Sequence, residues 1–269
     1  MPPVGHEHSR RLLAIGLTAS ALTACVMQPR KPSMTSRTRL SDYKAEHYAS
    51  VPSFGLGRAT YDDLDQALLE GRLMLVGDVH DDMLLHERIH ALVERSAQLA
   101  KRARARLRVF VEFIGLEDEA RVAAWLRSDD ELETLRAALR RRWPESWLEG
   151  ARGIHAAFYR RLLGSARQLD FDLRALEPVP RLALDERDLV MATVLQRARQ
   201  EAKKTIDLVI VGHAHLLGRD HLVDALGDEG ARAVVILPDI EEAPAHGAPL
   251  SKLDEGLYRW TRAALPTRR

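Results

Sequence analysis

Short apolar runs alternate along the chain with longer amphipathic stretches. The apolar runs are rich in β-branched residues and lie at 72–76, 107–114, 171–176, 206–211 and 233–237. Such runs are typical of buried parallel strands. The stretches between them have helical spacing and lie at about 82–100, 117–141, 151–168, 185–203 and 215–226. This alternation predicts an α/β fold, with a mostly parallel central sheet flanked by helices.

Two parts of the pattern do not fit a simple alternation. The helical region 117–168 is longer than one crossover requires, so we expect a helical cap insertion over one end of the sheet. The α/β domain is predicted to span 59–240, followed by a tail, 241–269, with one short helix at about 252–263. The helical spacing of the tail is carried by these apolar residues: Leu253, Leu257 and Trp260.

The N-terminus has the pattern of an export signal. Arg10 and Arg11 precede an apolar stretch, residues 12–21, which is too short to span a bilayer as a permanent helix. The stretch ends in a Leu-Thr-Ala-Cys sequence at 22–25 that resembles a bacterial lipobox. The resemblance implies a lipoprotein signal peptide of residues 1–24 and lipidation, including palmitate, of the cysteine at position 25. The paired arginines leave open whether export uses the general or the twin-arginine route.

Residues 25–58 are rich in Pro, Ser and Gly and predict a flexible tether between the lipidated Cys25 and the domain. Val26 follows the cysteine, which by analogy with bacterial lipoproteins favours the outer membrane. We therefore expect a cell-envelope protein that is anchored in the lipid bilayer and faces the periplasm or the surface.

The composition mainly argues against certain partners and sites. The formal net charge of the 269 residues is +1, so bulk charge does not predict a nucleic-acid partner. Two local arginine runs, at 102–106 and 140–142, fit solvated helix faces or linkers. Cys25 is the only cysteine, so neither a disulfide framework nor a Cys-based zinc site is expected.

Two of the apolar runs end in the same Gly-x-x-His pattern, from Gly77 to His80 and from Gly212 to His215. Open α/β sheets hold ligands at the carboxyl ends of their strands, and neighbouring strands lie about 4.8 Å apart. We therefore expect the two histidines to share one site. Glu112 interrupts a third apolar run, where a carboxylate is costly to bury unless it is paired or coordinated.

The trio of His80, Glu112 and His215 permits several chemistries. Two imidazoles and a carboxylate are a familiar ligand set for a divalent metal with an open position. The same residues would be catalytic if the metal activated water, or if Glu112 or a histidine acted as a general base without metal. An ion pair between Glu112 and Arg187 is the structural alternative. Two residues inside the motifs are candidates for ligands or for partners that orient the imidazoles: Asp78 and His213.

A separate pattern at 86–90 matches the H-E-x-x-H sequence of zincin metalloproteases. The predicted helix has its own apolar stripe, and no acidic residue downstream stands out as a third ligand. We interpret the match as incidental, with His86 near the site and His90 one turn farther away.

The ordered set of motifs resembles the ChaN-like haem-binding lipoproteins, which belong to a wider group with the Tiki, TraB and erythromycin-esterase-like proteins. The resemblance covers about 60–240, and its segments are 77–86, 111–113, 158–162, 186–192 and 211–215. The sequence departs from the family's pattern in three places, one of which is Asp82 or Asp188, where the family commonly has Asn. Asp78 stands where the family commonly has Glu, and Leu85 with His86 stands in place of a paired histidine.

The resemblance implies haem binding linked to iron uptake, with a Tyr or His as the ligand to haem iron. The cofactor-binding candidates are Asp78, His80, His86, Tyr159, Arg187, His213 and His215, with His155 as a further candidate iron ligand. The wider group also implies an alternative, a metal-dependent hydrolase that uses the His, Glu and His site. The sequence leaves open whether the chain is an enzyme, whether the ligand is haem or another small molecule, and whether the cleft forms in a homodimer.

Overall fold

The computed structural model describes residues 51, 55–140, 147–148, 154–202, 204–218, 221–238 and 249–261. The predicted signal peptide, Cys25 and most of the tether lie outside the described residues. Within the described part, no helix is long and apolar enough to cross a membrane.

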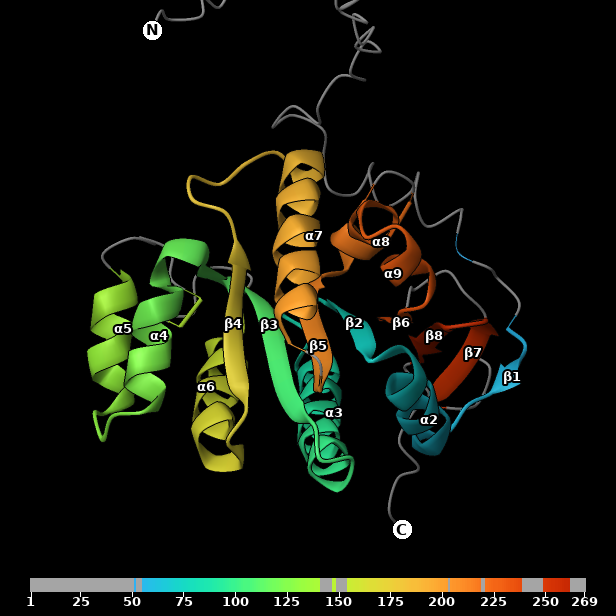
Figure 1. Cartoon of the computed structure of the whole chain (residues 1–269), viewed down its shortest axis with the longest axis horizontal. Coiled ribbons are helices and arrows are strands. Elements are labelled where there is room, and N and C mark those ends of the chain that lie inside the picture. Colours follow the sequence, from blue (N-terminus) through green and yellow to red (C-terminus); the bar gives the residue numbers. More distant parts are fainter. Residues whose placement is uncertain are drawn as a thin grey trace, which may run out of the picture. The chain divides into compact units, whose positions relative to one another are not determined.

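An eight-stranded sheet forms the centre of the fold, in the order β1-β7-β8-β6-β2-β5-β3-β4 (Figure 1). Its strands are β1 (Gly57–Arg58), β2 (Leu73–Asp78), β3 (Arg106–Gly115), β4 (Asp172–Glu177), β5 (Thr205–Gly212), β6 (Val234–Leu237), β7 (Leu250–Asp254) and β8 (Leu257–Trp260). Within this sheet β7 runs antiparallel to both of its neighbours, and the other pairs are parallel. The predicted α/β class with a mostly parallel sheet is confirmed.

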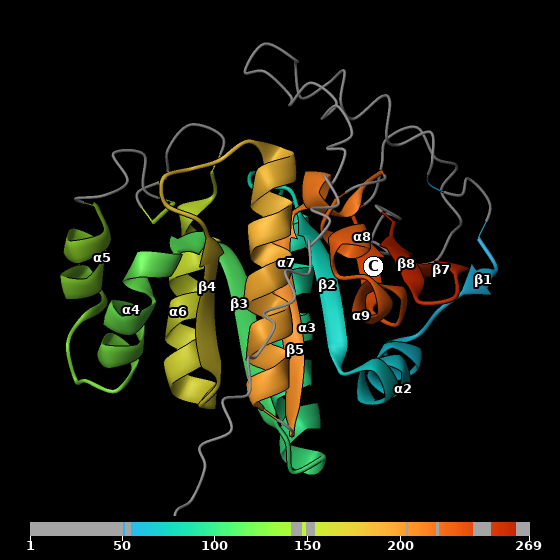
Figure 2. The same ribbon diagram turned by 45° about the horizontal axis from the view of Figure 1, so that its top comes forward.

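Helices cover both faces of the sheet (Figures 1 and 2). The α-helices are α2 (Tyr61–Gly71), α3 (Met83–Arg102), α4 (Glu119–Leu126), α5 (Leu132–Arg140), α6 (Ala156–Leu169), α7 (Leu184–Glu201), α8 (Leu222–Ala225) and α9 (Asp228–Ala231), with 3-10 turns η1 (Leu116–Asp118) and η2 (His213–Leu216). Alternate residues of β2 face opposite clusters, because side chains alternate along a strand. Met74 packs with the apolar faces of α2, α3 and α6, whereas Leu75 packs with those of α7 and α8.

The prediction of a C-terminal helix was wrong, because β7 and β8 occupy that region as a hairpin. Gly256 has a φ of 73° in the turn between the strands, a conformation that L side chains rarely adopt. Tyr258 and Trp260, two residues apart, bury in the same cluster, which is the spacing of a strand. The helical stripe seen in the sequence was a coincidence of spacing over a short segment.

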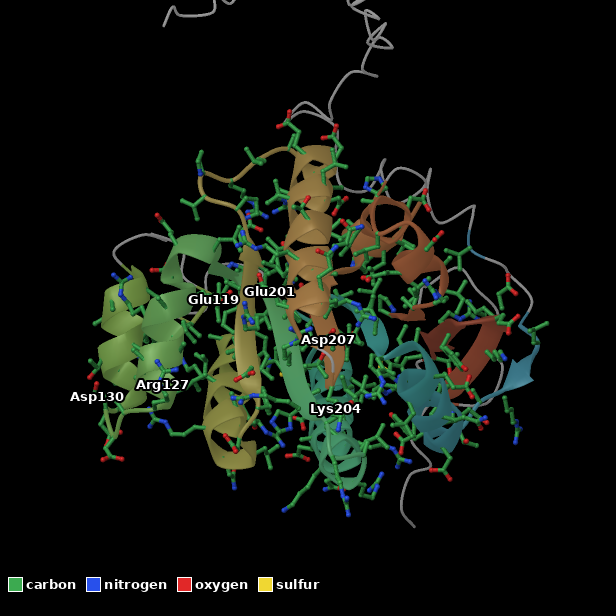
Figure 3. The ribbon with its side chains drawn as sticks, viewed as in Figure 1. Glu119, Arg127, Asp130, Glu201, Lys204 and Asp207 are labelled. Atoms are coloured by element: carbon green, nitrogen blue, oxygen red, sulfur yellow. The ribbon has the colours of Figure 1, made fainter. Side chains whose placement is uncertain are left out.

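The predicted helical insertion is present, and two of its described residues, Trp147 and His155, contact His80 at the carboxyl end of the sheet. Helix α6 packs on α3 as an ordinary crossover helix, and α4 lies beside β4 at the edge of the sheet (Figure 1). Glu119 of α4 lies next to β4 (Figure 3) and accepts the outward N–H of Ala175 at 3.1 Å and the Nε–H of Arg174 at 2.6 Å. The insertion therefore closes a free strand edge, which otherwise offers unpaired backbone groups to other chains.

Candidate functional site

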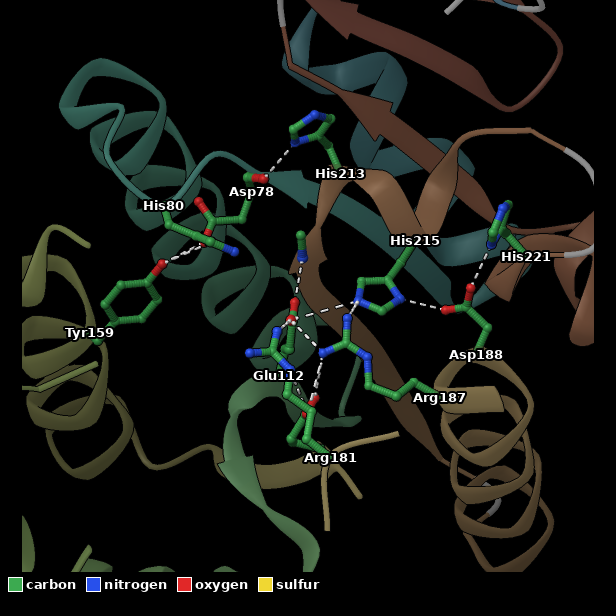
Figure 4. Close-up of polar contacts among 12 residues, drawn as sticks. Asp78, His80, Glu112, Tyr159, Arg181, Arg187, Asp188, His213, His215 and His221 are labelled. Atoms are coloured by element: carbon green, nitrogen blue, oxygen red, sulfur yellow. Dashed lines mark hydrogen bonds and ion pairs between the residues drawn. The ribbon is translucent and has the colours of Figure 1, made fainter. Parts of the chain in front are cut away.

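The two Gly-x-x-His motifs meet at the carboxyl edge of the sheet. Strands β2 and β5 pair in parallel, with Asp78 opposite Gly212, and β5 also pairs with β3, which carries Glu112. His80 and His215 follow directly from the ends of the two paired strands (Figure 4). The predicted shared location of His80, Glu112 and His215 is therefore observed.

Asp78 is buried at the centre of the first part of the site. Its carboxylate lies 3.0 Å from His80 Nδ1 and 2.6 Å from the hydroxyl of Tyr159 (Figure 4), and 2.8 Å from His86 Nε2. Burial would raise the pKa of Asp78, but the contacts with His80 and His86 outweigh it and lower the pKa to about 2. Burial and the adjacent Asp78 raise the pKa of Tyr159 well above its usual value, so its hydroxyl stays protonated and donates.

These contacts determine which nitrogen of His80 carries the proton. An ionised Asp78 only accepts hydrogen bonds, so neutral His80 must hold its proton on Nδ1. Nε2 then carries a lone pair. The side chain of His80 is 32% exposed, and the Trp147 ring meets the His80 ring edge-on at 4.4 Å between centroids. Burial lowers the pKa of His80, but Asp78 and Glu112 raise it by more, and the net shift is upward.

The start of helix α3 completes this part of the site. Asp82 accepts the N–H of Leu85 at 3.0 Å and so begins the helix two residues after His80. The first turn of the helix then brings His86 over Asp78. His86 Nδ1 lies 3.2 Å from Nδ1 of His155, which directly precedes α6. The predicted position of His86 near the site is confirmed, while His90 contacts Ser165 at 2.8 Å instead.

Glu112 is the buried carboxylate of the second part of the site. It accepts the backbone N–H of Gly212 at 2.6 Å, and its Oε1 lies 3.6 Å from Arg187 Nη1 and 3.9 Å from Arg181 Nη2. Burial would raise the pKa of Glu112, but the charges of His215, His80 and Arg187 outweigh it and hold the pKa well below its usual range. The predicted Glu112–Arg187 ion pair is confirmed, and Glu112 is ionised at neutral pH.

His215 is buried between two carboxylates. Its Nδ1 lies 2.5 Å from Asp188, and its Nε2 lies 3.6 Å from Glu112 and 3.0 Å from Arg187 Nη2. Burial lowers the pKa of His215, but Glu112 and Asp188 outweigh it and raise the pKa to about 9. Neutral His215 accepts from Arg187 through Nε2, whereas protonated His215 donates toward Glu112. Two further groups complete the network. Glu177 accepts a hydrogen bond from Arg187 at 3.2 Å, and His221 contacts Asp188 at 2.7 Å.

The two motif glycines are needed for close approach rather than for turning. A methyl group on Gly212 would lie 3.2 Å from Glu112 Oε2 and 3.3 Å from His80 Cε1. A methyl group on Gly77 would lie 2.9 Å from the ring of Pro238 and 3.0 Å from Cβ of His213. Gly212 therefore lets His80 and Glu112 approach each other, and Gly77 lets η2 pack against β2.

A metal centre on His80, Glu112 and His215 is not supported by this geometry. Among the described residues, no group of three or more His, Cys, Asp or Glu side chains is arranged to hold a metal ion. Arg187 contacts both Glu112 and His215, so its guanidinium supplies the positive charge between them that a metal would supply. His213 Nδ1 contacts the backbone oxygen of Asp78 at 3.0 Å.

Several site residues were not predicted as such. Arg181 lies on the connection between β4 and α7, where no periodicity marks it, and it reaches both Glu112 and Glu177. Glu177 is the charged residue that ends β4, at the same edge of the sheet as the two motif histidines. Cation and carboxylate residues at strand ends could therefore have been added to the predicted site.

The space inside the site is small. A cavity of about 10 Å³ is lined by Asp78, Glu112, Tyr159 and Gly212, together with the rings of Phe113, Phe158 and Trp147. This volume is enough for about one water molecule. This cavity therefore cannot hold a larger ligand, whereas the side chain of His80, which does not line it, is 32% exposed.

Comparison with known proteins identifies the fold. No family profile matches the sequence, and no curated protein matches it. One similar structure is ChaN of Campylobacter jejuni, which is described as binding haem cofacially. The match covers 69% of this chain and 88% of the ChaN chain, with a TM-score of 0.50 and 9% sequence identity. The type III effector HopBA1 matches 72% of this chain with 90% of its own, at a TM-score of 0.47 and 16% identity. The chain therefore has a distant, ChaN-like fold relationship, and at these identities the likeness concerns the fold alone.

Proposed function

We propose that the site is that of a metal-independent hydrolase in which His80 is the general base. The observation that carries the proposal is the set of hydrogen bonds at Asp78, which directs the lone pair of His80 Nε2 away from the carboxylate. In the proposed reaction Nε2 takes a proton from a water molecule as the water oxygen attacks a carbonyl carbon, and Asp78 stabilises the imidazolium that forms. The tetrahedral intermediate then collapses: its C–O or C–N bond breaks, and the imidazolium gives its proton to the leaving alcohol or amine, which returns His80 to the neutral form.

The charged groups beside His80 have matching roles. The carbonyl oxygen becomes negative as water adds, and a fixed positive charge nearby lowers that barrier. Arg181 is the cation that a substrate can reach, because its side chain is 57% exposed while Arg187 is buried. Glu112 holds Arg181 and Arg187 in place and favours the protonated form of His80 once it has formed. Esters and amides are the substrate classes that fit this chemistry.

The proposal is tested with a panel of chromogenic esters and fluorogenic peptides, in the presence of EDTA. Turnover should persist in EDTA and fall by a factor of about 10² to 10⁴ in His80→Gln, the range for loss of a general base. Arg88→Gln, a change on α3 away from the site, is the control. Turnover that EDTA abolishes, or that His80→Gln leaves unchanged, would contradict the proposal.

Haem binding is the second candidate, and the exposed Nε2 of His80 is the observation that favours it. The other candidate ligands are engaged: Tyr159 donates to Asp78, His86 uses both nitrogens, and His215 is buried. His80 beside Trp147 would therefore hold the iron. The small cavity cannot enclose a haem, so it would lie on the surface, covered by a second copy as in a homodimer. The cofacial haem binding of ChaN is consistent with this arrangement.

Haem titration separates the two candidates. If His80 holds haem, a Soret shift should saturate with added haem and disappear in His80→Ala, while Tyr159→Phe should retain it. No Soret shift with the wild-type chain would rule out this candidate without affecting the hydrolase proposal.

We also propose that the chain is a lipoprotein of the cell envelope, anchored through Cys25 after removal of residues 1–24 and located at the outer membrane. The lipobox-like sequence supports this proposal. Mass spectrometry of the envelope-purified protein should find an acylated N-terminal peptide that starts at Cys25. Recovery of the unprocessed N-terminus would contradict it.

A further inference from the structure

The amino edge of the sheet, opposite the proposed hydrolase site, carries a groove of about 790 Å³. Three helix-to-strand connections form it: α3 to β3, α6 to β4, and α7 to β5. Lys204 directly precedes β5 at the amino end of the strand (Figure 3), whereas His215 of the site follows the carboxyl end of β5 (Figure 4). The predicted arginine run at 102–106 contributes to this groove, so it is more than a solvated helix face.

The charges that line the groove are mostly positive. The cations are Lys101, Arg104, Arg106 and Lys204, and the lining acid is Asp170. Arg106 pairs with Asp172 at 2.6 Å, which lies beside the groove. Within the described residues, no hydrogen bond or ion pair engages the side chains of Lys101, Arg104 or Lys204. The groove therefore has cations available for an anionic partner.

The floor of the groove is apolar. Leu107 and Phe171 are buried beneath it, alanines of α3 line one side, and Leu169 projects with 37% of its surface exposed. Arg104 has a φ of 50°, a left-handed conformation that Gly or Asn adopts more easily than Arg. A cationic rim around an exposed apolar side chain matches the interface of an anionic bilayer, where phosphate groups lie beside acyl chains.

We propose that this groove, defined as Lys101, residues 104–107, residues 168–171 and Lys204, docks the domain on an anionic phospholipid surface. Phosphate headgroups contact the three unpaired cations, and Leu169 enters the acyl boundary. Since the groove and the proposed hydrolase site are at opposite edges of the sheet, docking turns the carboxyl edge away from the bilayer. The proposal is independent of both the hydrolase and the haem candidates.

The test is vesicle co-sedimentation of residues 25–269 carrying Cys25→Ser, which contains every described residue and cannot be acylated. Binding should be strong to vesicles of equal phosphatidylglycerol and phosphatidylcholine, weak to phosphatidylcholine alone, and weaker as salt increases. Replacing Lys101, Arg104 and Lys204 with Ala should reduce the partition coefficient about 100-fold, because each basic residue near an anionic surface contributes on the order of 1 kcal/mol.

Two further variants make the result specific. Replacing Arg58, Arg197 and Arg232 with Ala removes the same charge from exposed positions outside the groove and should change binding by less than about threefold. Lys101→Arg, Arg104→Lys and Lys204→Arg together keep the charge and should keep binding, which excludes misfolding as the cause. Equal losses in both alanine triples, or no preference for anionic vesicles, would overturn the proposal. So would displacement from vesicles by millimolar glycerol phosphate, because the groove would then be a site for small soluble phosphates.

Discussion

His80 and His215 occupy equivalent positions after neighbouring strands, yet their surroundings differ. The side chain of His80 is 32% exposed and contacts a single carboxylate, whereas that of His215 is 2% exposed and lies between Glu112 and Asp188. In the first case one ring nitrogen remains available to a substrate. In the second both nitrogens are engaged inside the protein. The shared strand-end geometry places the two rings, and their neighbours leave one partly exposed and make the other a fixed part of the ion-pair network.

The largest loss of stability is expected when the network around His215 loses the negative charge of Glu112. Glu112→Gln should keep the hydrogen bond from Gly212 but leave Arg187 and protonated His215 with less compensating charge. Because breaking a buried ion pair on one side is costly, the free energy of unfolding should fall by about 3 kcal/mol in urea titrations. Glu133→Gln breaks an exposed pair with Arg136 and should cost less than about 0.5 kcal/mol. Similar losses in the two variants would contradict the buried role of Glu112.

The raised pKa of His215 predicts how stability depends on pH. The pKa is about 9 in the folded protein and 6.5 in the reference state. Protonated His215 therefore stabilises the folded state fully below pH 6.5, and this contribution, about 3 kcal/mol, is lost as pH rises through 9. Urea unfolding at pH 6 and pH 9.5 measures the difference. In His215→Gln the fall in the free energy of unfolding between pH 6 and pH 9.5 should be smaller by about 3 kcal/mol. An identical fall in the wild type and the variant would show that His215 does not cause the pH dependence.

The fold could be predicted largely from the sequence, because the buried strands of a parallel sheet form continuous apolar runs. Strands β2 to β6 match the five predicted runs closely. The hairpin of β7 and β8 could not be predicted in this way. Its apolar residues fit helical and strand spacing equally over so short a segment, and pairing with β6 decided between them.

The site could be predicted only where a residue type was unexpected in its local pattern. Glu112 interrupts an apolar strand and the two histidines follow glycines, so these were found. Arg181 was missed because an arginine in a connecting segment is ordinary until the fold brings it to Glu112. A metal was one of the chemistries that the sequence left open, because the sequence shows the ligand types and a possible Glu112–Arg187 pair but not that the Arg187 guanidinium also contacts His215.

The two motif glycines allow the same substitution, Gly to Ala, to be made in both motifs, so that the surroundings of the two motifs can be compared directly. Gly77→Ala places a methyl group against the ring of Pro238 and should destabilise the fold by about 2 kcal/mol, with little effect on turnover per folded molecule. Gly212→Ala places its methyl group against His80 and Glu112, whose side chains can shift by a few tenths of an ångström. Its stability loss should be smaller, about 1 kcal/mol, and its turnover should fall. Thermal unfolding and kcat should be measured on both variants. Equal losses of stability and equal losses of kcat in the two variants would contradict the prediction.

Tyr159→Phe should have a small effect on stability and a specific effect on the pKa of His80. The ring stays packed, and Asp78 keeps its contacts with His80 and His86, so the loss should be about 1 kcal/mol. Without the tyrosine hydroxyl, the negative charge of Asp78 acts more strongly on the His80 proton, and the pKa of His80 should rise. Since the neutral imidazole is the proposed base, the acid limb of the pH–rate profile should move to higher pH. Tyr258→Phe alters another buried tyrosine outside the site and should leave the limb in place. A shift toward lower pH in Tyr159→Phe would mean that the hydroxyl acts on His80 directly, across the 3.4 Å to Nδ1, and not through Asp78.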